Sequence, residues 1–196
     1  IEVIHAVVDM LQLGDLVSAT AVCRVFRYCA RLRITEAWPS FQPLFKLPFK
    51  LNGWDLINKT SYLAYGTHIG SDEMNAFLAA IANGALGKLK RLTFRENKMG
   101  NEGVKTLSAG IASGTIGKLK HLKCLNLILN EIGDAGMISL AEALKSPMAA
   151  LPKLHQISLS GNSAKMTGVE EACSARKINL FKGCSCSARG IKICRC

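Results

Sequence analysis

An internal repeat of 32 to 33 residues constrains this chain more than any other feature of its sequence. One pattern of apolar residues ends at Asn97, Asn130 and Asn162, so successive copies lie 33 and 32 residues apart. Repeats of this length are units of secondary structure that cannot bury their apolar faces alone and must stack on their neighbours. The repeat therefore predicts a solenoid of stacked units.

One unit combines the signals of a strand, a turn and a helix. Leu92 and Phe94 alternate with polar residues, as the buried side chains of a short strand do. Asn97 follows, where a buried amide can bond turn backbone, and Gly100 permits a tight turn, as Gly133 does one copy later. In residues 104–111 the apolar side chains recur three and four apart, which predicts an amphipathic helix.

The other copies are less regular. Around Ile69-Gly70 an earlier copy keeps the turn and helix signals but lacks a clean strand pattern. Gly84 and Gly114 lie where a glycine is expected to end a helix. The copy after Asn162 loses the glycine of its turn, as terminal repeats that cap a solenoid often do.

The repeated pattern resembles the ribonuclease-inhibitor-like class of leucine-rich repeats over about residues 69–175. This resemblance implies an α/β fold, a short leucine-rich-repeat solenoid with parallel strands on its concave face and helices on its convex face. We assign the repeats to residues 59–180 and a C-terminal cap or tail to residues 181–196.

Residues 1–38 lack the repeat pattern and predict a small all-α module. Two apolar helical stripes are separated there at Gly14-Asp15. The run from Met10 to Trp38 resembles an F-box, although the Leu-Pro pair that usually opens that motif is absent. The resemblance implies docking onto the Skp-type adaptor of a cullin–RING (SCF-type) ubiquitin ligase. The positions that match the adaptor-facing ones are Leu11, Leu16, Val22, Cys23, Phe26 and Trp38. The alternative is that these helices only cap the first repeat.

Residues 39–58 contain three prolines together with several aromatic side chains. Proline stops a helix from continuing, whereas aromatic rings favour burial. We therefore predict a packed connector between the helical module and the repeats.

In leucine-rich repeats of this class, the side chains between the buried strand positions face out of the concave surface. Here they are Arg91, Thr93, Arg95, Cys124, Asn126, Ile128, Gln156, Ser158 and Ser160. Their mixed polar character suits recognition of a protein better than binding of a small molecule. We predict that these nine residues bind a target protein.

The formal net charge of +11 is concentrated in the second half of the chain. Basic residues precede successive strands and should align into a ridge along one rim: Lys88, Lys90, Arg91, Lys118, Lys120, Lys123 and Lys153. Such a ridge could steer an acidic or phosphorylated target, or simply solubilise the protein. Nucleic acid is a weaker expectation, because no aromatic residues interleave with the lysines as stacking platforms.

The first four of the eight cysteines are dispersed among apolar residues. This pattern is typical of buried reduced thiols and favours an intracellular location, cytoplasmic or nuclear. Four further cysteines form two Cys-x-Cys pairs at Cys184, Cys186, Cys194 and Cys196. Four thiolates could hold zinc, but such pairs are a weak signal and lie in a duplicated segment, so we predict no metal and no cofactor.

No apolar run reaches the length of a membrane-spanning helix, and no nucleotide-binding, metalloprotease or serine-hydrolase motif is present. We therefore predict a non-enzymatic protein-binding module without a membrane or small-molecule partner. The leading hypothesis is the F-box substrate receptor. Its alternatives are an interaction scaffold or inhibitor without a ubiquitin link and, less favoured, a GTPase-activating protein of the Ran type, whose catalytic arginine motif has no match here.

Overall fold

The computed structural model describes residues 59–182 of the chain, which form five short strands and four α-helices in regular alternation. The strands are β1 (Ser61–Leu63), β2 (Arg91–Thr93), β3 (Cys124–Asn126), β4 (Gln156–Ser158) and β5 (Asn179–Phe181). The helices are α5 (Ser71–Ala82), α6 (Gly100–Ala112), α7 (Asp134–Lys145) and α8 (Thr167–Ala175), with a 3-10 turn, η1 (Ile116–Lys118), before β3.

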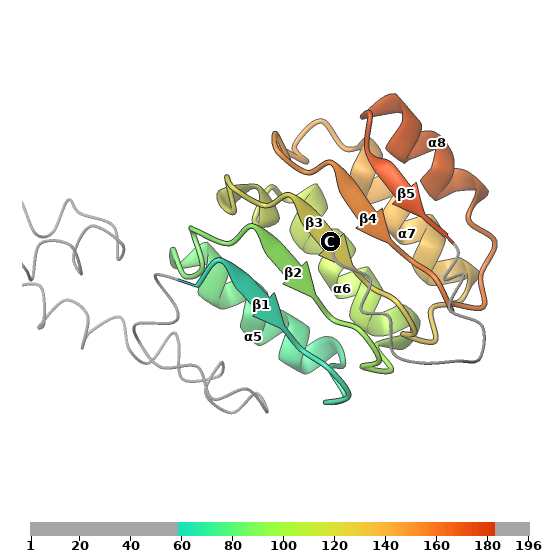
Figure 1. The fold of residues 1–196 in the computed structure, drawn as a ribbon, viewed down its shortest axis with the longest axis horizontal. Helices are drawn as coiled ribbons and strands as arrows, with labels where there is room; N and C mark the ends of the chain where they lie inside the picture. The colour runs from blue at the N-terminus through green and yellow to red at the C-terminus, as the bar shows by residue number, and fades with distance from the viewer. Residues whose placement is uncertain (1–58, 183–196) are drawn as a thin grey trace, which may run out of the picture.

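All strand pairs are parallel, and the strands lie in the sheet in sequence order from β1 to β5. Figure 1 shows the sheet as one layer and the four helices as a second layer behind it. Each unit therefore contacts only the units before and after it in the chain, as in a solenoid. The expected α/β repeat with parallel strands is confirmed in this part of the chain.

The hydrophobic core lies between the two layers. Leu92, Leu125 and Ile157 are paired across β2, β3 and β4 and are all buried. In the first unit the core is aromatic, because the rings of Tyr62 and Phe77 lie 5.2 Å apart between centroids. Such aromatic contacts bury large apolar areas, which fixes the first helix against the sheet.

A column of asparagine side chains joins each unit to the one before it. The Nδ2 group of Asn130 donates to the carbonyls of Phe94 (2.6 Å) and Ile128 (3.2 Å), and its Oδ1 accepts from the backbone N–H of Asn97 at 3.0 Å. Asn162 repeats this arrangement one unit later. The expectation that these amides bond turn backbone is confirmed. The column supplies hydrogen bonds to buried backbone groups of the turns, which lie beyond the ends of the strands.

Of the two glycines expected at tight turns, only one has the predicted conformation. Gly100 adopts a positive φ of 58°, which suits a residue without a Cβ. Gly133 instead has extended backbone and is the N-cap of α7. There its N–H donates to Oδ1 of Asn101 at 2.8 Å, so the previous helix caps the next. The tight-turn prediction is therefore wrong at Gly133.

The expected helix-ending glycines are confirmed, because Gly84 and Gly114 follow the C-caps of α5 and α6 with φ of 89° and 78°. Side chains from the next unit bond the carbonyls that remain at two helix ends. Lys118 donates from Nζ to the carbonyl of Ala82 at 2.6 Å. The guanidinium of Arg176 donates to three carbonyls in and just after the last turn of α7, namely Leu144, Ser146 and Ala149.

The structure corrects the view of the first unit. The sequence shows no clean strand before Ile69-Gly70, yet β1 pairs with β2 along its full length. Tyr62 occupies the position of Leu92, and Thr67 takes the place of the asparagine, bonding Oδ1 of Asn97 through Oγ1 at 2.6 Å. The sequence pattern did not reveal this strand because tyrosine and threonine replace the leucine and asparagine of the other units.

The prediction of buried cysteines is tested only in part. Cys124 and Cys173 are buried, as predicted, whereas the other six cysteines lie outside the described residues. Within residues 59–182, every helix is too short and too polar to cross a bilayer. No group of three potential metal ligands occurs in the same part of the chain.

Candidate protein-binding face

The side of the sheet away from the helices forms a regular array of side chains, here called the strand face. Because strand side chains alternate, the residues on either side of the buried position Leu92 project there, and the register aligns them between strands. The five rows of the strand face, from β1 to β5, are Ser61, Leu63 and Tyr65; Arg91, Thr93 and Arg95; Cys124, Asn126 and Ile128; Gln156, Ser158 and Ser160; and Asn179 and Phe181.

All nine residues predicted to bind a target lie in three consecutive rows of this face, but they differ in exposure. Arg91 is exposed, and Thr93, Arg95 and Gln156 are partly buried. The remaining five are buried, namely Cys124, Asn126, Ile128, Ser158 and Ser160. The expectation that the whole set lies exposed is therefore wrong for β3 and most of β4.

Local hydrogen bonds account for part of this burial. Asn126 turns its Oδ1 onto the backbone N–H of Ile128 at 3.0 Å, which holds the amide against the sheet. The Nε2 group of Gln156 donates to the hydroxyl of Ser158 at 3.4 Å. Polar groups that bond within the face have less capacity to bond a partner.

The most exposed apolar side chains of the face lie in β1 and just after it, in a strand that sequence reasoning missed. Leu63 is 65% exposed and Tyr65 is 60% exposed. Both alternate with the buried residues Tyr62 and Ala64, and this period of two was the available signal. The signal was overlooked because neither buried residue is leucine.

Arg95 and Glu96 hold Tyr65 from the neighbouring unit. The guanidinium carbon of Arg95 lies 5.8 Å from the centre of the Tyr65 ring, within the range of a cation–π contact. The Nε of Arg95 also donates to Oε1 of Glu96 at 3.1 Å. A hydrogen bond to Glu96 is the largest cause that raises the pKa of the Tyr65 hydroxyl, so this phenol is neutral at physiological pH.

The exposed part of the strand face thus combines apolar, aromatic and basic groups on two adjacent strands. We call Leu63, Tyr65, Arg91, Thr93 and Arg95 the β1–β2 patch. Tyrosine and arginine are enriched where protein interfaces gain most of their binding energy. The patch can therefore bury an apolar group and bond a carboxylate of a partner at the same time.

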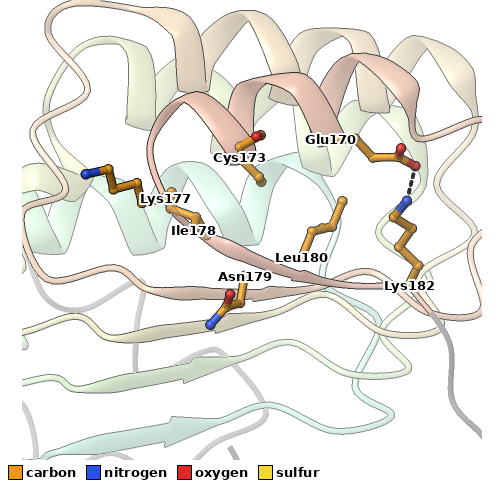
Figure 2. Close-up of a pocket in the computed structure, with 8 residues that line it drawn as sticks. Glu170, Cys173, Lys177, Ile178, Asn179, Leu180 and Lys182 are labelled. Atoms are coloured by element: carbon orange, nitrogen blue, oxygen red, sulfur yellow. Dashed lines mark ion pairs between the residues drawn. The ribbon is translucent and has the colours of Figure 1, made fainter.

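A hollow of about 430 Å³ lies at the last unit, between α8 and β5. Figure 2 shows Cys173 of α8 and Leu180 of β5 facing this space, with an ion pair of 2.5 Å between Glu170 and Lys182 at one end. Burial raises the pKa of the Cys173 thiol to about 11, so the thiol is protonated at neutral pH. A protonated thiol is a poor nucleophile, so Cys173 is not suited to nucleophilic chemistry at neutral pH.

The residues predicted to contact an adaptor all lie outside the described residues, as does the cysteine-rich tail. They are Leu11, Leu16, Val22, Cys23, Phe26 and Trp38 for the adaptor, with Cys184, Cys186, Cys194 and Cys196 in the tail. The interpretation of both segments therefore rests on their sequence.

Comparison with known proteins adds one match. No curated protein matches the chain. A family model described as Leucine Rich repeat matches residues 88–108 and 118–141, which contain β2, most of α6, β3 and part of α7. The matched segments and the parallel one-strand, one-helix units agree in phase. Residues 88–141 therefore carry leucine-rich repeats, a unit that typically binds other proteins.

Proposed function

We propose that this chain is a target-binding subunit that recognises another protein through the β1–β2 patch. The exposure of Leu63 and Tyr65 beside Arg91 and Arg95 is the observation that carries this proposal. An apolar side chain that is two-thirds exposed on a sheet face gains free energy when a partner covers it. In this proposal the units belong to the ribonuclease-inhibitor-like class, which their length of 32 to 33 residues supports.

In the finer form of the proposal, residues 1–38 dock on the Skp-type adaptor of a cullin–RING ubiquitin ligase, in the cytoplasm or nucleus. The support is the F-box-like run from Met10 to Trp38. The chain would then be non-catalytic and would bring its target to the ligase. Without adaptor binding, the same patch would serve an interaction scaffold or inhibitor.

The adaptor link is tested with the purified full chain and a recombinant Skp-type adaptor in a pull-down. A double variant, Leu16→Asp with Phe26→Asp, is expected to abolish the interaction, because buried carboxylates disrupt an apolar interface. The control variant Leu63→Ser with Tyr65→Ser is expected to retain it. A folded wild-type chain that does not bind would exclude the ligase role and leave the scaffold.

Target binding is tested separately by affinity capture followed by quantitative mass spectrometry. Proteins that depend on the β1–β2 patch should be retained by the wild type and lost by Leu63→Ser with Tyr65→Ser. The matched control is Leu129→Ser with Ile138→Ser, which removes two exposed apolar groups elsewhere. If both double variants lose the same proteins, the patch is not the binding surface.

A further inference from the structure

Charge is strongly segregated between the two ends of the sheet. The four connections that lead from a helix to the next strand, residues 83–90, 113–123, 146–155 and 176–178, are here called the basic rim. They contain eight Lys and Arg and no Asp or Glu. The connections from strand to helix, by contrast, hold three Lys and Arg against two Glu. The positive charge of the repeats is therefore concentrated at the end of the sheet where the strands begin (Figure 1).

Stacking brings the basic side chains of different units together. The backbone N–H of Lys123 donates to the carbonyl of Lys90 at 2.8 Å, so these two lysines are neighbours across adjacent strands. The Nζ of Lys153 lies 3.4 Å from Nδ1 of His121, so these side chains of successive units are in contact. Adjacent strands are only about 4.8 Å apart, so the charges of Lys90 and Lys123 repel one another in the isolated protein.

Only some of the basic side chains in this rim bond the carbonyls at helix ends. Lys118 and Arg176 are bonded to carbonyls at the ends of α5 and α7, so their charges have a structural role. Lys90, Lys120 and Lys123 are exposed. An acidic partner would remove the repulsion among them, which makes the rim complementary to negative charge.

The rim also carries an apolar side chain, which bears on the kind of partner. Met148, in the connection before β4, is 63% exposed. Residues 83–90, 113–123, 146–155 and 176–178 contain no Phe, Tyr or Trp, so the large rings that stack on nucleic-acid bases are absent from the rim, whose only rings are those of His121 and His155. An exposed methionine in the same rim as these lysines suits a polypeptide that presents both carboxylates and an apolar side chain.

We propose that the basic rim is a second protein-binding surface, which holds an acidic polypeptide segment with its carboxylates on Lys90, Lys120 and Lys123 and an apolar side chain on Met148. This surface lies at the strand-start end of the molecule and is separate from the β1–β2 patch. It requires neither adaptor binding nor the target proposed above.

The test uses fluorescence anisotropy of a fluorescein-labelled, 12-residue peptide of alternating Glu and Leu, titrated with the full chain. Its control is the same peptide with Gln in place of Glu. The rim variant is Lys90→Glu with Lys123→Glu, and the matched variant is Lys98→Glu with Lys165→Glu, at the opposite end of the sheet. Both variants change the net charge equally and replace exposed side chains.

We expect the Glu peptide to bind, the Gln peptide to bind at least about tenfold more weakly, and affinity to fall with added salt. The rim variant should lose at least about tenfold in affinity, the matched variant less than about threefold, and Met148→Ser about two- to fivefold. Circular dichroism verifies that each variant is folded, and Lys120→Glu with Lys153→Glu replaces any rim variant that is not.

Equal losses in the rim and matched variants would overturn the proposal, because net charge alone would then govern binding. Absence of Glu-peptide binding would overturn it as well. Tighter, rim-dependent binding of a 12-base-pair DNA duplex or of phosphatidylserine vesicles would assign the rim to a nucleic acid or a membrane instead of a protein.

Discussion

Asparagine is required in the buried column because its side chain both donates and accepts hydrogen bonds without charge. Asn130 donates twice to carbonyls and accepts from backbone N–H groups of the preceding unit. Aspartate could accept hydrogen bonds from the backbone N–H groups but could not donate any to the carbonyls. Its burial as an anion would also be costly. Leucine would leave all of the backbone groups unbonded.

Replacement of Asn130 by alanine should lower the free energy of unfolding by about 3 kcal/mol, because several buried backbone groups lose their partner. Urea denaturation monitored by circular dichroism measures the change. The control is Asn75→Ala on the exposed side of α5, which should alter stability by less than about 0.5 kcal/mol. Similar losses in both variants would show that the column contributes little.

The buried thiol of Cys173 should make stability sensitive to alkaline pH. Burial raises its pKa to about 11 in the folded protein, above the ordinary value of a thiol. At neutral pH the thiol is protonated in both states, so its contribution is fully present. As pH rises, the unfolded chain ionises first, and the free energy of unfolding falls until the folded thiol also ionises.

Urea denaturation at pH 8 and pH 10 checks this expectation. The loss of stability between the two pH values should be smaller in Cys173→Ala than in the wild type, although the variant is less stable at pH 8. An equal loss in both proteins would mean that Cys173 does not ionise differently on unfolding.

At the scale of the elements, the units are joined at helix ends as well as in the sheet. Arg176 follows α8 but bonds carbonyls at the end of α7, so it belongs chemically to the preceding unit. Its positive charge also opposes the negative end of the helix dipole. This side chain therefore couples two helices that are also joined by an ion pair of 3.6 Å between Lys145 and Glu171.

We expect Arg176→Met to lower the free energy of unfolding by about 2 kcal/mol, since three charge-assisted bonds are lost at a half-buried site. Thermal denaturation in parallel with Lys177→Met gives the comparison, because that variant loses the same charge from an exposed neighbour. If the two variants melt alike, net charge and not helix capping is responsible.

Leucine, isoleucine or phenylalanine at the core positions sufficed to predict β2, β3 and β4, whereas β5 was missed although Ile178 and Leu180 pack into the core there. The three predicted strands, and the helices after the repeated turn signals, were found because the strand period of two and the helix spacing of three and four were both present. β1 was missed because Tyr62 and Ala64 fill its core positions. Leu63 and Tyr65 of the patch were therefore not predicted either. The burial of Asn126 and Ile128 depends on contacts between units, which one repeat cannot reveal.

At the scale of the whole molecule, each unit is stabilised by two neighbours except at the ends. β3 is paired with β2 and β4, whereas β5 is paired with β4 alone among the described strands. In a stack that gains stability from nearest neighbours, the interior units should open least often. The fold is therefore expected to have a gradient of local stability.

Native-state hydrogen exchange followed by mass spectrometry measures that gradient. Peptides covering β3 and α6 should exchange at least about tenfold more slowly than those covering α8 and β5. Uniform protection from β1 to β5 would indicate that the described units open as one cooperative body.

Segregation of charge between the two ends of the sheet gives residues 59–182 an electric dipole moment directed along the strands. In the field of any negatively charged object, a torque turns the strand-start end toward that object before contact occurs. A carboxylated sensor surface is such an object. The protein should therefore adsorb there in one preferred orientation, with the strand-to-helix connections facing the solution.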